Sequence, residues 1–489
     1  MSALKKLASQ TVVYGASHIL GRLVNYLLVP LQTRVFNPNE YGTINEFYSY
    51  VTFFIVLLTY GMETAFFRFA NKEPGNAKVF STALISLIGS SLLFVGLIGL
   101  FAHPIAGAIH YEQHHEYVIY FACILSLDAL ASVPFAYLRQ QSKPLRFALI
   151  KNTNILINIL LNLYFLLLCP YVQQTKGVSL PFYSGQIGVG YVFVSNLAAS
   201  ALTLPLLFKE IKLVSNGFDA TIWKQMLTYG VPLLIVGLGG MINETLDRAI
   251  MKYLLPDMNE GLRQVGIYGA NYKLSILITM FIQAYRYAAE PFFFSQSASE
   301  DSRKVYARVM NYFVIICLFI FLLVTLYIDV FKYFIGPGFW EGLKIVPVLL
   351  LANVCLGVYF NLSIWYKLSD QTNKGAIISI LGAAITIVLN IWWIPLYGYE
   401  GSAWATFICY FAMMLISYVW GQKAYPIPYQ TGRIAGYTIL AMLLFLLNGQ
   451  LQQRLSDTAS HLLSGAMLIA FAGVALLFER KNKTVTSRH

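Results

Sequence analysis

The chain has 489 residues, of which 57% are hydrophobic and 11% are charged, and its mean hydropathy is +0.62. Soluble globular domains carry about 25% charged residues, so this composition excludes a soluble protein and indicates an integral membrane protein. The formal net charge is +12, which by itself would also suit a protein that binds nucleic acid.

Long apolar runs follow one another along the whole chain. A helix needs about 20 apolar residues to cross the roughly 30 Å of hydrocarbon in a bilayer. Fourteen such runs occur, and in chain order they cover residues 11–33, 41–61, 79–102, 117–137, 147–168, 183–207, 229–252, 265–289, 309–331, 343–365, 375–396, 400–421, 433–450 and 460–478. We therefore expect an all-α integral membrane protein with about 14 transmembrane helices.

The basic residues are unevenly distributed between the two sides that these spans define. If both termini are cytoplasmic, 23 of the 34 Lys and Arg residues lie in inside segments, seven lie in outside loops and four lie within spans. An excess of Lys and Arg in cytoplasmic loops is the rule for membrane proteins. The positive charge is thus explained by topology, and we expect cytoplasmic termini and no nucleic-acid partner.

No sequence pattern indicates a metal, a disulfide or a nucleotide. The five cysteines lie in or at the ends of spans without metal-ligand spacing, and the outside loop His110–Glu116 matches no strict metal motif. The sequence has neither a Walker A motif nor a glycine-rich nucleotide fingerprint. We expect no cofactor, so transport would be driven by an H⁺ or Na⁺ gradient or by the membrane potential. The first apolar run is too long for a cleavable signal peptide, so we expect it to remain as the first helix.

Two halves of the chain resemble each other weakly. The segment "LNLYFLLLCP" (Leu161–Pro170) is echoed by "LNIWWIPLYG" (Leu389–Gly398), and the first span resembles the seventh. Parallel repeats of this kind are a transporter arrangement, with the pathway between the halves. We expect an N-terminal six-helix bundle at 1–212, a C-terminal six-helix bundle at 213–424, and two additional helices with a basic cytoplasmic tail at 425–489.

The segment "MINETLDRAIMKYLL" places charges inside the seventh span. Glu244, Asp247 and Arg248 fall on one face of the helix that the sequence predicts. A charge at the centre of a transmembrane helix costs about 2.5–3.5 kcal/mol, so such residues usually mark an ion or substrate path. We expect this face to line a hydrated cavity. The alternative is a structural ion pair near the outer interface, with Lys252 extending outward to water.

The first span carries a second set of polar residues. His18, Arg22 and Asn25 share a helix face, and Arg22 lies about half-way along the span. Because a guanidinium group fits phosphate oxygens, Arg22 and Arg248 on the two repeat-related helices could bind a diphosphate. The alternative is that Arg22 pairs with Asp128 of the fourth span.

Two further candidates lie in other spans. Lys273 in the eighth span faces either the lumen or the interface, and the sequence does not decide between them. Asp128 is a candidate proton or sodium site, because a carboxylate within a span is costly unless it has a partner.

Three motifs resemble one known family. They are "LQTRVFNPNEYG" (Leu31–Gly42) at the exit of the first span, "LDRAIM…VGIYGANYKLS" (Leu246–Ser275) at the start of the second half, and "YLRQQSKPLRF" (Tyr137–Phe147) after the fourth span. With two parallel halves, two extra helices and cationic spans, the chain resembles the multidrug/oligosaccharidyl-lipid/polysaccharide (MOP) flippase superfamily. Within it, the chain looks most like the polysaccharide transporters, the Wzx-type O-antigen and capsule flippases.

The resemblance implies a mechanism and favours some of the site residues. Arg34, Asp247, Arg248 and Lys273 match positions that the family pattern also favours. The family alternates between inward-facing and outward-facing states around a cationic cavity, while the undecaprenyl tail of the substrate stays in lipid. The expected substrate-binding cations are Arg22, Arg34, Arg248 and Lys273; the expected ion-coupling or cavity acids are Asp128, Glu244 and Asp247; the expected cavity polar residues are His18 and Asn25.

Two other functions were weighed against a flippase. An ion-coupled multidrug or cation antiporter of the same superfamily would favour acidic and aromatic cavity groups, whereas the deep charges here have both signs. A membrane polymerase or ligase for lipid-linked sugars usually needs a large outside loop, and these loops are short. We therefore expect a non-enzymatic flippase for undecaprenyl-diphosphate-linked oligosaccharides in the bacterial cytoplasmic (inner) membrane. It would serve O-antigen, lipopolysaccharide or another surface polysaccharide, with membrane lipids and the polysaccharide polymerase machinery as partners.

Overall fold

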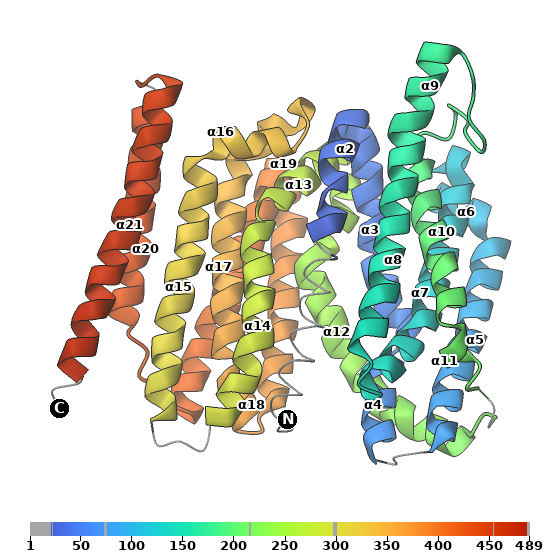
Figure 1. Ribbon diagram of the computed structural model, residues 1–489, viewed down its shortest axis with the longest axis horizontal. Coiled ribbons are helices and arrows are strands. Elements are labelled where there is room, and N and C mark those ends of the chain that lie inside the picture. The colour runs from blue at the N-terminus through green and yellow to red at the C-terminus, as the bar shows by residue number, and fades with distance from the viewer. Residues whose placement is uncertain are drawn as a thin grey trace. The chain divides into compact units, whose positions relative to one another are not determined.

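The computed structural model describes residues 21, 23–72, 76–214, 217–296, 301–452 and 454–486. Within these residues all regular secondary structure is helical, without any β-strand, which confirms the predicted all-α class (Figure 1). The chain divides into two compact units, Met1–Gly266 and Ile267–His489. The division into repeats at 212/213 follows from sequence similarity and stays a prediction.

The first unit contains the helices of the N-terminal half and one more long helix. In chain order they are α2 (Leu28–Val35), α3 (Pro38–Thr59), α4 (Met62–Lys72), α5 (Ala77–Leu100), α6 (Ala102–Ala108), η1 (Glu112–His114), α7 (His115–Gln140), α8 (Pro144–Leu163), η2 (Tyr164–Leu168), α9 (Cys169–Lys176), α10 (Gly190–Leu206), α11 (Phe208–Ile211) and α12 (Ala220–Leu254). Helix α13 (Met258–Leu274) begins in this unit and ends in the second.

The second unit contains the remaining helices. They are α14 (Ile276–Gln296), α15 (Ser302–Leu326), α16 (Ile328–Phe331), η3 (Lys332–Phe334), η4 (Pro337–Ile345), α17 (Val346–Leu362), α18 (Ile364–Leu368), α19 (Thr372–Ala424), α20 (Thr431–Gln452) and α21 (Asp457–Thr486). Within this unit α17 packs against α19, and α15 packs against α14, α17, α20 and α21.

The predicted number of fourteen spans is not confirmed. Ten helices in the described part of the chain are long and apolar enough to cross a membrane, or eleven if the bent pair α13–α14 is one span. The predicted spans 375–396 and 400–421 lie on either side of Gly398, whose non-helical angles (φ 56°, ψ −138°) divide α19 into two helices at a kink. The predicted span 183–207 corresponds to α10, an apolar helix of only 17 residues. Residues 11–20 and 22 of the predicted span 11–33 lie outside the described residues.

Local sequence fixes both ends of α3. The Asn37 Oδ1 atom accepts a hydrogen bond from the Glu40 backbone N–H at 3.0 Å, and Glu40 Oε2 accepts from the Asn37 N–H at 2.9 Å. This capping box, with Pro38 at the first helical position, sets where the helix begins. At the other end Tyr60 (φ 33°) and Gly61 (φ 74°) are left-handed and separate α3 from α4.

Helix α12 packs along α3, α4 and α5, and backbone atoms of α12 contact backbone atoms at the C-terminal end of α3. A Cβ atom on Gly230 would lie 2.7 Å from the Tyr60 carbonyl oxygen, and one on Gly61 would lie 2.8 Å from the Gly230 oxygen. Further along, a Cβ on Gly237 would lie 3.3 Å from a methyl group of Val56. Only glycine permits this approach at Gly61 and Gly230. These two glycines are therefore the sequence feature that allows the close contact between α3 and α12.

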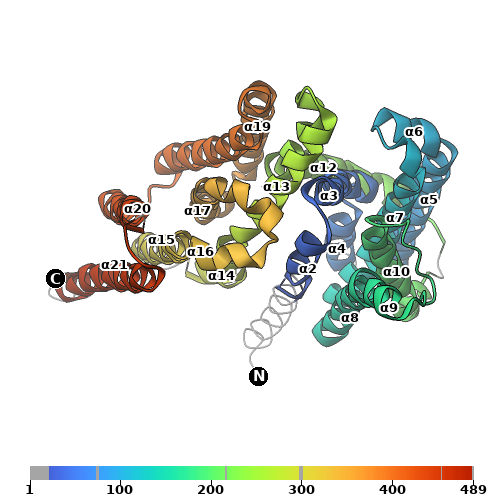
Figure 2. The same ribbon diagram turned by 90° about the horizontal axis from the view of Figure 1, so that it is seen from above.

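The rest of the first unit is built around α7, which contacts α5, α8 and α10 (Figure 2). An aromatic cluster joins these helices to α3. The ring centroids of Phe47 and Phe121 are 4.9 Å apart, and those of Phe121 and Phe193 are 4.7 Å apart. Such pairs stabilise by about 0.5–1.5 kcal/mol beyond the area that they bury, so α3 is held firmly on this side.

The second unit contains a broken span. Helices α13 and α14 are bent by 52° relative to each other, with Ser275 between them. The Ser275 hydroxyl donates to the Tyr272 carbonyl at 2.7 Å and accepts from Asn353 Nδ2 of α17 at 3.1 Å. A buried side chain of another helix thus satisfies the polar group at the break.

Candidate functional site

The charged segment of the seventh span lies near the C-terminal end of α12. Asp247 and Arg248 are both buried, and Arg248 Nε lies 3.3 Å from Asp247 Oδ1. The same oxygen accepts from the Arg248 backbone N–H at 2.8 Å, and the guanidinium group also donates to the Glu244 carbonyl. The Glu244 side chain is exposed. The structure therefore brings Asp247 and Arg248 together as a buried pair and places the Glu244 carboxylate in a different environment.

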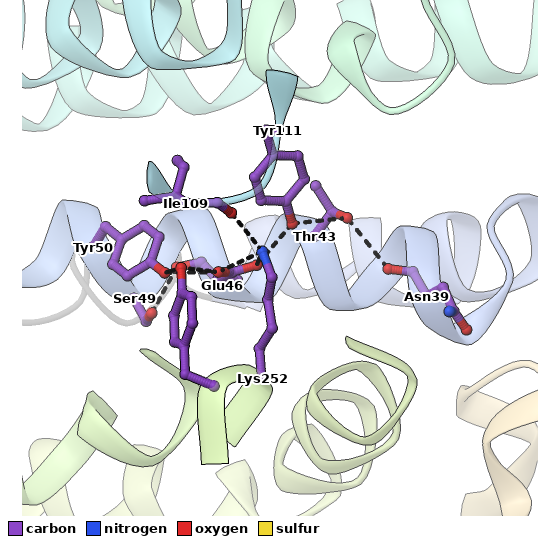
Figure 3. A network of polar contacts seen from close by, with 9 residues as sticks. Asn39, Thr43, Glu46, Ser49, Tyr50, Ile109, Tyr111 and Lys252 are labelled. Atoms are coloured by element: carbon purple, nitrogen blue, oxygen red, sulfur yellow. Dashed lines mark hydrogen bonds and ion pairs between the residues drawn. The ribbon is translucent and has the colours of Figure 1, made fainter. Parts of the chain in front are cut away.

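One turn beyond Arg248, Lys252 forms a buried ion pair with Glu46 of α3 (Figure 3). The two side chains are 1% and 0% exposed. Lys252 Nζ lies 3.3 Å from each carboxylate oxygen and donates to the Ile109 carbonyl at 2.8 Å. The alternative in which Lys252 extends outward to water is wrong in this respect, because the Glu46 carboxylate and the Ile109 carbonyl hold its ammonium group in the interior.

Three tyrosines complete the shell around the Glu46 carboxylate. The Tyr50 hydroxyl donates to Oε1 at 2.6 Å, the Tyr111 hydroxyl donates to Oε2 at 2.7 Å, and the Tyr253 hydroxyl lies 3.2 Å from Oε1. The Lys252 ammonium lies 4.0 Å from the centroid of the Tyr111 ring, a cation–π distance. Buried charges are tolerated only when they are paired and hydrogen-bonded, and both charges of this pair meet that condition.

Tyr111 comes from the segment between α6 and η1, which lies outside the spans. Burial and the neighbouring Glu46 carboxylate raise the pKa of Tyr111, so its hydroxyl keeps its proton and acts as a donor. It also lies 3.3 Å from Thr43 Oγ1, and the Thr43 hydroxyl donates to the Asn39 carbonyl (Figure 3). The network thus joins three segments of the first unit: α3, α12 and residues 109–111.

A second polar group lies among α3, α7, α8 and α10. Asp128 accepts a hydrogen bond from Ser200 Oγ at 2.8 Å, and its side chain is exposed although it lies well inside α7. Asn196 Nδ2 of α10 donates to the Tyr48 hydroxyl at 2.9 Å. Lys151 of α8 exerts an electrostatic attraction on Asp128. The group offers a carboxylate, hydroxyls and an amide, which are the ligand types that a proton or a small monovalent cation would use.

The other predicted site residues are distributed along both units. His18 and Arg22 lie outside the described residues, so their proximity to each other or to Asp128 stays a prediction. Asn25 and Arg34 are exposed, and Arg34 Nη1 donates to a backbone carbonyl one turn earlier in α2 at 2.8 Å. Lys273 is half-buried near the end of α13, in the second unit. A single cavity containing all these groups is a hypothesis that rests on the sequence.

The histidine-rich outside loop shows no metal-binding arrangement. His114 Nδ1 lies 2.9 Å from Glu116 Oε1, with both side chains partly exposed, and the rings of His103 and His115 stack at 4.0 Å. Across the described parts of the chain, no group of three or more His, Cys, Asp or Glu residues could hold a metal ion.

Sequence reasoning missed Glu46, the partner of Lys252. A signal was present, because Glu46 is an acidic residue within the second predicted span and precedes Tyr50 by one helical turn. Its partner could not be found in the same way, since Lys252 is 206 residues further along the chain.

Solved structures that resemble this chain are membrane transporters. A structure described as "Lipid II flippase MurJ, inward closed conformation" matches with a TM-score of 0.71 and 16% identity, covering 96% of this chain and 99% of that one. An inward-facing multidrug resistance MATE family transporter of the MOP superfamily matches with a TM-score of 0.63 and 14% identity, covering 87% and 95%. The chain therefore has the helical transporter fold of the MOP superfamily.

The family described as "Polysaccharide biosynthesis protein" matches residues 7–297, and the chain belongs to this family, the polysaccharide flippase branch of the superfamily. A relative named "Lsg locus putative protein 1" from Haemophilus influenzae is 20% identical over 434 residues, covering 84% of this chain and 99% of the relative. The family that the sequence motifs resemble is thereby confirmed.

Proposed function

We propose that this protein flips undecaprenyl-diphosphate-linked oligosaccharide units across the bacterial cytoplasmic membrane by alternating access. One observation supports it above all others: a member of the polysaccharide biosynthesis family has, over 96% of its length, the fold of a lipid II flippase. A lipid-linked intermediate of polysaccharide synthesis is the substrate class that agrees with both the family and the fold. The units would be delivered on the outer face to the polymerase that assembles the surface polysaccharide.

Arg248 is the proposed ligand of the diphosphate. A guanidinium group presents a planar fork of N–H donors that suits phosphate oxygens, and burial strengthens such charge-assisted hydrogen bonds. Asp247, at 3.3 Å, holds the guanidinium in place and limits the cost of burying it. Arg22, Arg34 and Lys273 are proposed as further cations along the path.

Asp128 is the proposed site of ion coupling. Its carboxylate is exposed within a span and has a hydroxyl ligand, Ser200 Oγ, at 2.8 Å. Binding of H⁺ or Na⁺ there would neutralise the charge and change its attraction to Lys151. A gradient of either ion, or the membrane potential, could then bias the conformational cycle.

The test is translocation of a fluorescent undecaprenyl-diphosphate oligosaccharide in proteoliposomes. We expect Arg248→Ala to slow flipping by about a hundredfold, since removing a group that binds a buried charge costs roughly 2–3 kcal/mol. Arg248→Lys should retain part of the activity, because an ammonium group keeps the charge without the planar fork. Lys304→Ala is the matched control: it removes an exposed cation paired with Asp301 at 2.9 Å, a contact worth at most about 1 kcal/mol. Flipping by Arg248→Ala at the wild-type rate would remove Arg248 from the substrate path.

A drug or cation antiporter is the second candidate, and the exposed Asp128 carboxylate favours it because such a group can bind an organic cation. Efflux of a cationic dye is measured in the same proteoliposomes. Dye efflux without flipping of the lipid-linked sugar would make the protein an antiporter and leave Asp247 and Arg248 as a structural pair.

A further inference from the structure

We propose that the Glu46–Lys252 network is a latch that closes the transport path on the outer side, and that it must open once in every cycle. The latch consists of Glu46, Lys252 and the three tyrosines Tyr50, Tyr111 and Tyr253. It rests on the proposed function and on the predicted topology: the protein must alternate between inward-facing and outward-facing states, and both termini must be cytoplasmic.

The latch joins elements that the sequence repeat assigns to different halves. Glu46 lies in α3, within the predicted first half, whereas Lys252 lies in α12, the first helix of the predicted second half. In the structure α12 nevertheless belongs to the compact unit Met1–Gly266. Something must hold α12 against α3, and the ion pair is the polar contact placed to do so.

The two ends of the α3–α12 contact differ in kind. At the inner end, Gly61 and Gly230 meet through backbone atoms alone, with no side chain of either residue to interlock. Pro232 follows within α12, and a proline inside a helix removes one backbone hydrogen bond and favours a bend. At the outer end, charged and hydroxyl groups bridge the helices. The Gly61–Gly230 contact would therefore be the pivot about which the helices move, and the contact at Lys252 would be the latch that opens.

The chemistry of the latch suits a contact that opens and closes. A buried ion pair adds little net stability, because desolvation offsets most of the attraction between the charges. When the helices separate, water can solvate both groups, so the open state recovers the desolvation energy that the closed state gave up. An apolar contact of the same area has no such compensation, because its exposure to water is unfavourable by about 25 cal/mol per Å². Ion pairs that are exchanged between states are accordingly a common element of conformational switches.

The first test is access of an aqueous thiol reagent to α3. Ser49 is buried one turn from Glu46, and its hydroxyl donates to the Glu46 carbonyl at 2.6 Å, so Ser49→Cys places a small reporter beside the latch. A membrane-impermeant maleimide is added from the outside, and labelling of the parent without Ser49→Cys is subtracted to remove the five native cysteines. We expect the double variant Glu46→Gln/Lys252→Met, which removes both charges, to label faster by roughly tenfold or more.

The matched control is Lys344→Met, which removes another ion pair, Lys344–Glu400 at 2.5 Å, whose side chains are 55% and 47% exposed. It should leave the labelling rate unchanged. An unchanged rate in the latch variant, with a normal melting temperature, would overturn the proposal. So would labelling that rises only from the inside.

The second test keeps every latch charge in place. Tyr50 and Tyr253 have hydroxyls 2.8 Å apart on the two helices, so Tyr50→Cys/Tyr253→Cys can be bridged by a bifunctional methanethiosulfonate reagent. Bridging should abolish flipping, and reduction should restore it. Each single cysteine variant should flip at the same rate before and after treatment with the reagent, because it cannot form the bridge.

The two tests separate failure of the latch from failure of the proposed substrate. Flipping at an undiminished rate by the bridged protein would overturn the latch. Faster Ser49→Cys labelling in the latch variant, with no flipping of lipid-linked sugar by the wild type, would keep the latch and reject the substrate.

Discussion

The two compact units differ in how many charged side chains they bury. Among the described residues, the first unit buries the charged side chains of Glu46, Glu210, Asp247, Arg248 and Lys252, whereas the second buries only that of Glu479. Both units bury amides, on Gln32, Asn162 and Asn243 in the first and on Asn271, Asn311, Asn353, Asn361, Asn390 and Asn448 in the second. A charge pair can be exchanged for water or for a charged ligand, while an amide makes the same few neutral contacts in every state. Charged groups of the kind that a conformational switch exchanges are therefore concentrated in the first unit among the described residues.

The amides of the second unit hold local irregularities in place. Asn353 Nδ2 donates to Ser275 Oγ at the α13–α14 break, and Asn271 Nδ2 donates to the Phe339 carbonyl at 2.9 Å, next to η4. The Oδ1 atoms of both residues are buried without a hydrogen-bond partner in the described structure. An unsatisfied buried acceptor costs about 1–3 kcal/mol. The stabilising contribution of each amide therefore comes from the hydrogen bonds that its Nδ2 atom donates.

The largest expected effect is a loss of stability when only one of the two latch charges is removed. Lys252→Met alone leaves the Glu46 carboxylate buried without its counter-charge, and should destabilise the first unit by about 3–5 kcal/mol. Glu46→Gln/Lys252→Met removes both charges and should be clearly more stable than the single variant. The measurement is thermal unfolding in detergent. Equal unfolding temperatures of the single and double variants would show that the two charges are not coupled.

A smaller effect is expected at the amides. Asn353→Leu removes the donor to Ser275 and should cost about 1–3 kcal/mol in the same unfolding assay. Asn353→Asp keeps the shape but puts a charge at a position that is only 1% exposed, so it should cost more than Asn353→Leu. If Asn353→Asp were as stable as the wild type, the second unit would tolerate buried charge and the contrast between the units would fail.

The smallest effect is expected at an exposed pair in the second unit. Lys332 Nζ lies 2.8 Å from Asp329 Oδ1, and this hydrogen bond raises the pKa of Lys332. A raised pKa of a cation stabilises the fold below its unfolded value of about 10.4 and stops doing so as the pH rises through the folded value. Since the pair is partly exposed, Asp329→Asn should cost no more than about 0.5 kcal/mol at pH 7. The difference from wild type should vanish at strongly alkaline pH; a difference that grows there would contradict this account.

The sequence predicted the fold class because length and hydropathy alone identify membrane helices. It also placed the boundary between the spans 375–396 and 400–421 correctly, because Gly398 lies there and breaks α19 into two helices. Within the candidate site, Asp247 and Arg248 could be paired from sequence because they are neighbours on one helix. The surroundings of Lys252 were predicted wrongly because its partner Glu46 is far away in the chain, and a cation near a helix end ordinarily reaches water.

Helices α3 and α13 meet through two glycines at the end of α3 that also carries the latch. A Cβ atom on Gly42 would collide with the Leu262 carbonyl, and one on Gly266 would collide with the Pro38 carbonyl. A methyl group at either position would therefore push the two helices apart by steric repulsion, without altering a charge or a hydrogen-bonding side chain. Alanine variants at Gly42 and Gly266 would therefore disfavour the closed contact that we propose for the latch by steric repulsion alone, and would favour its open state.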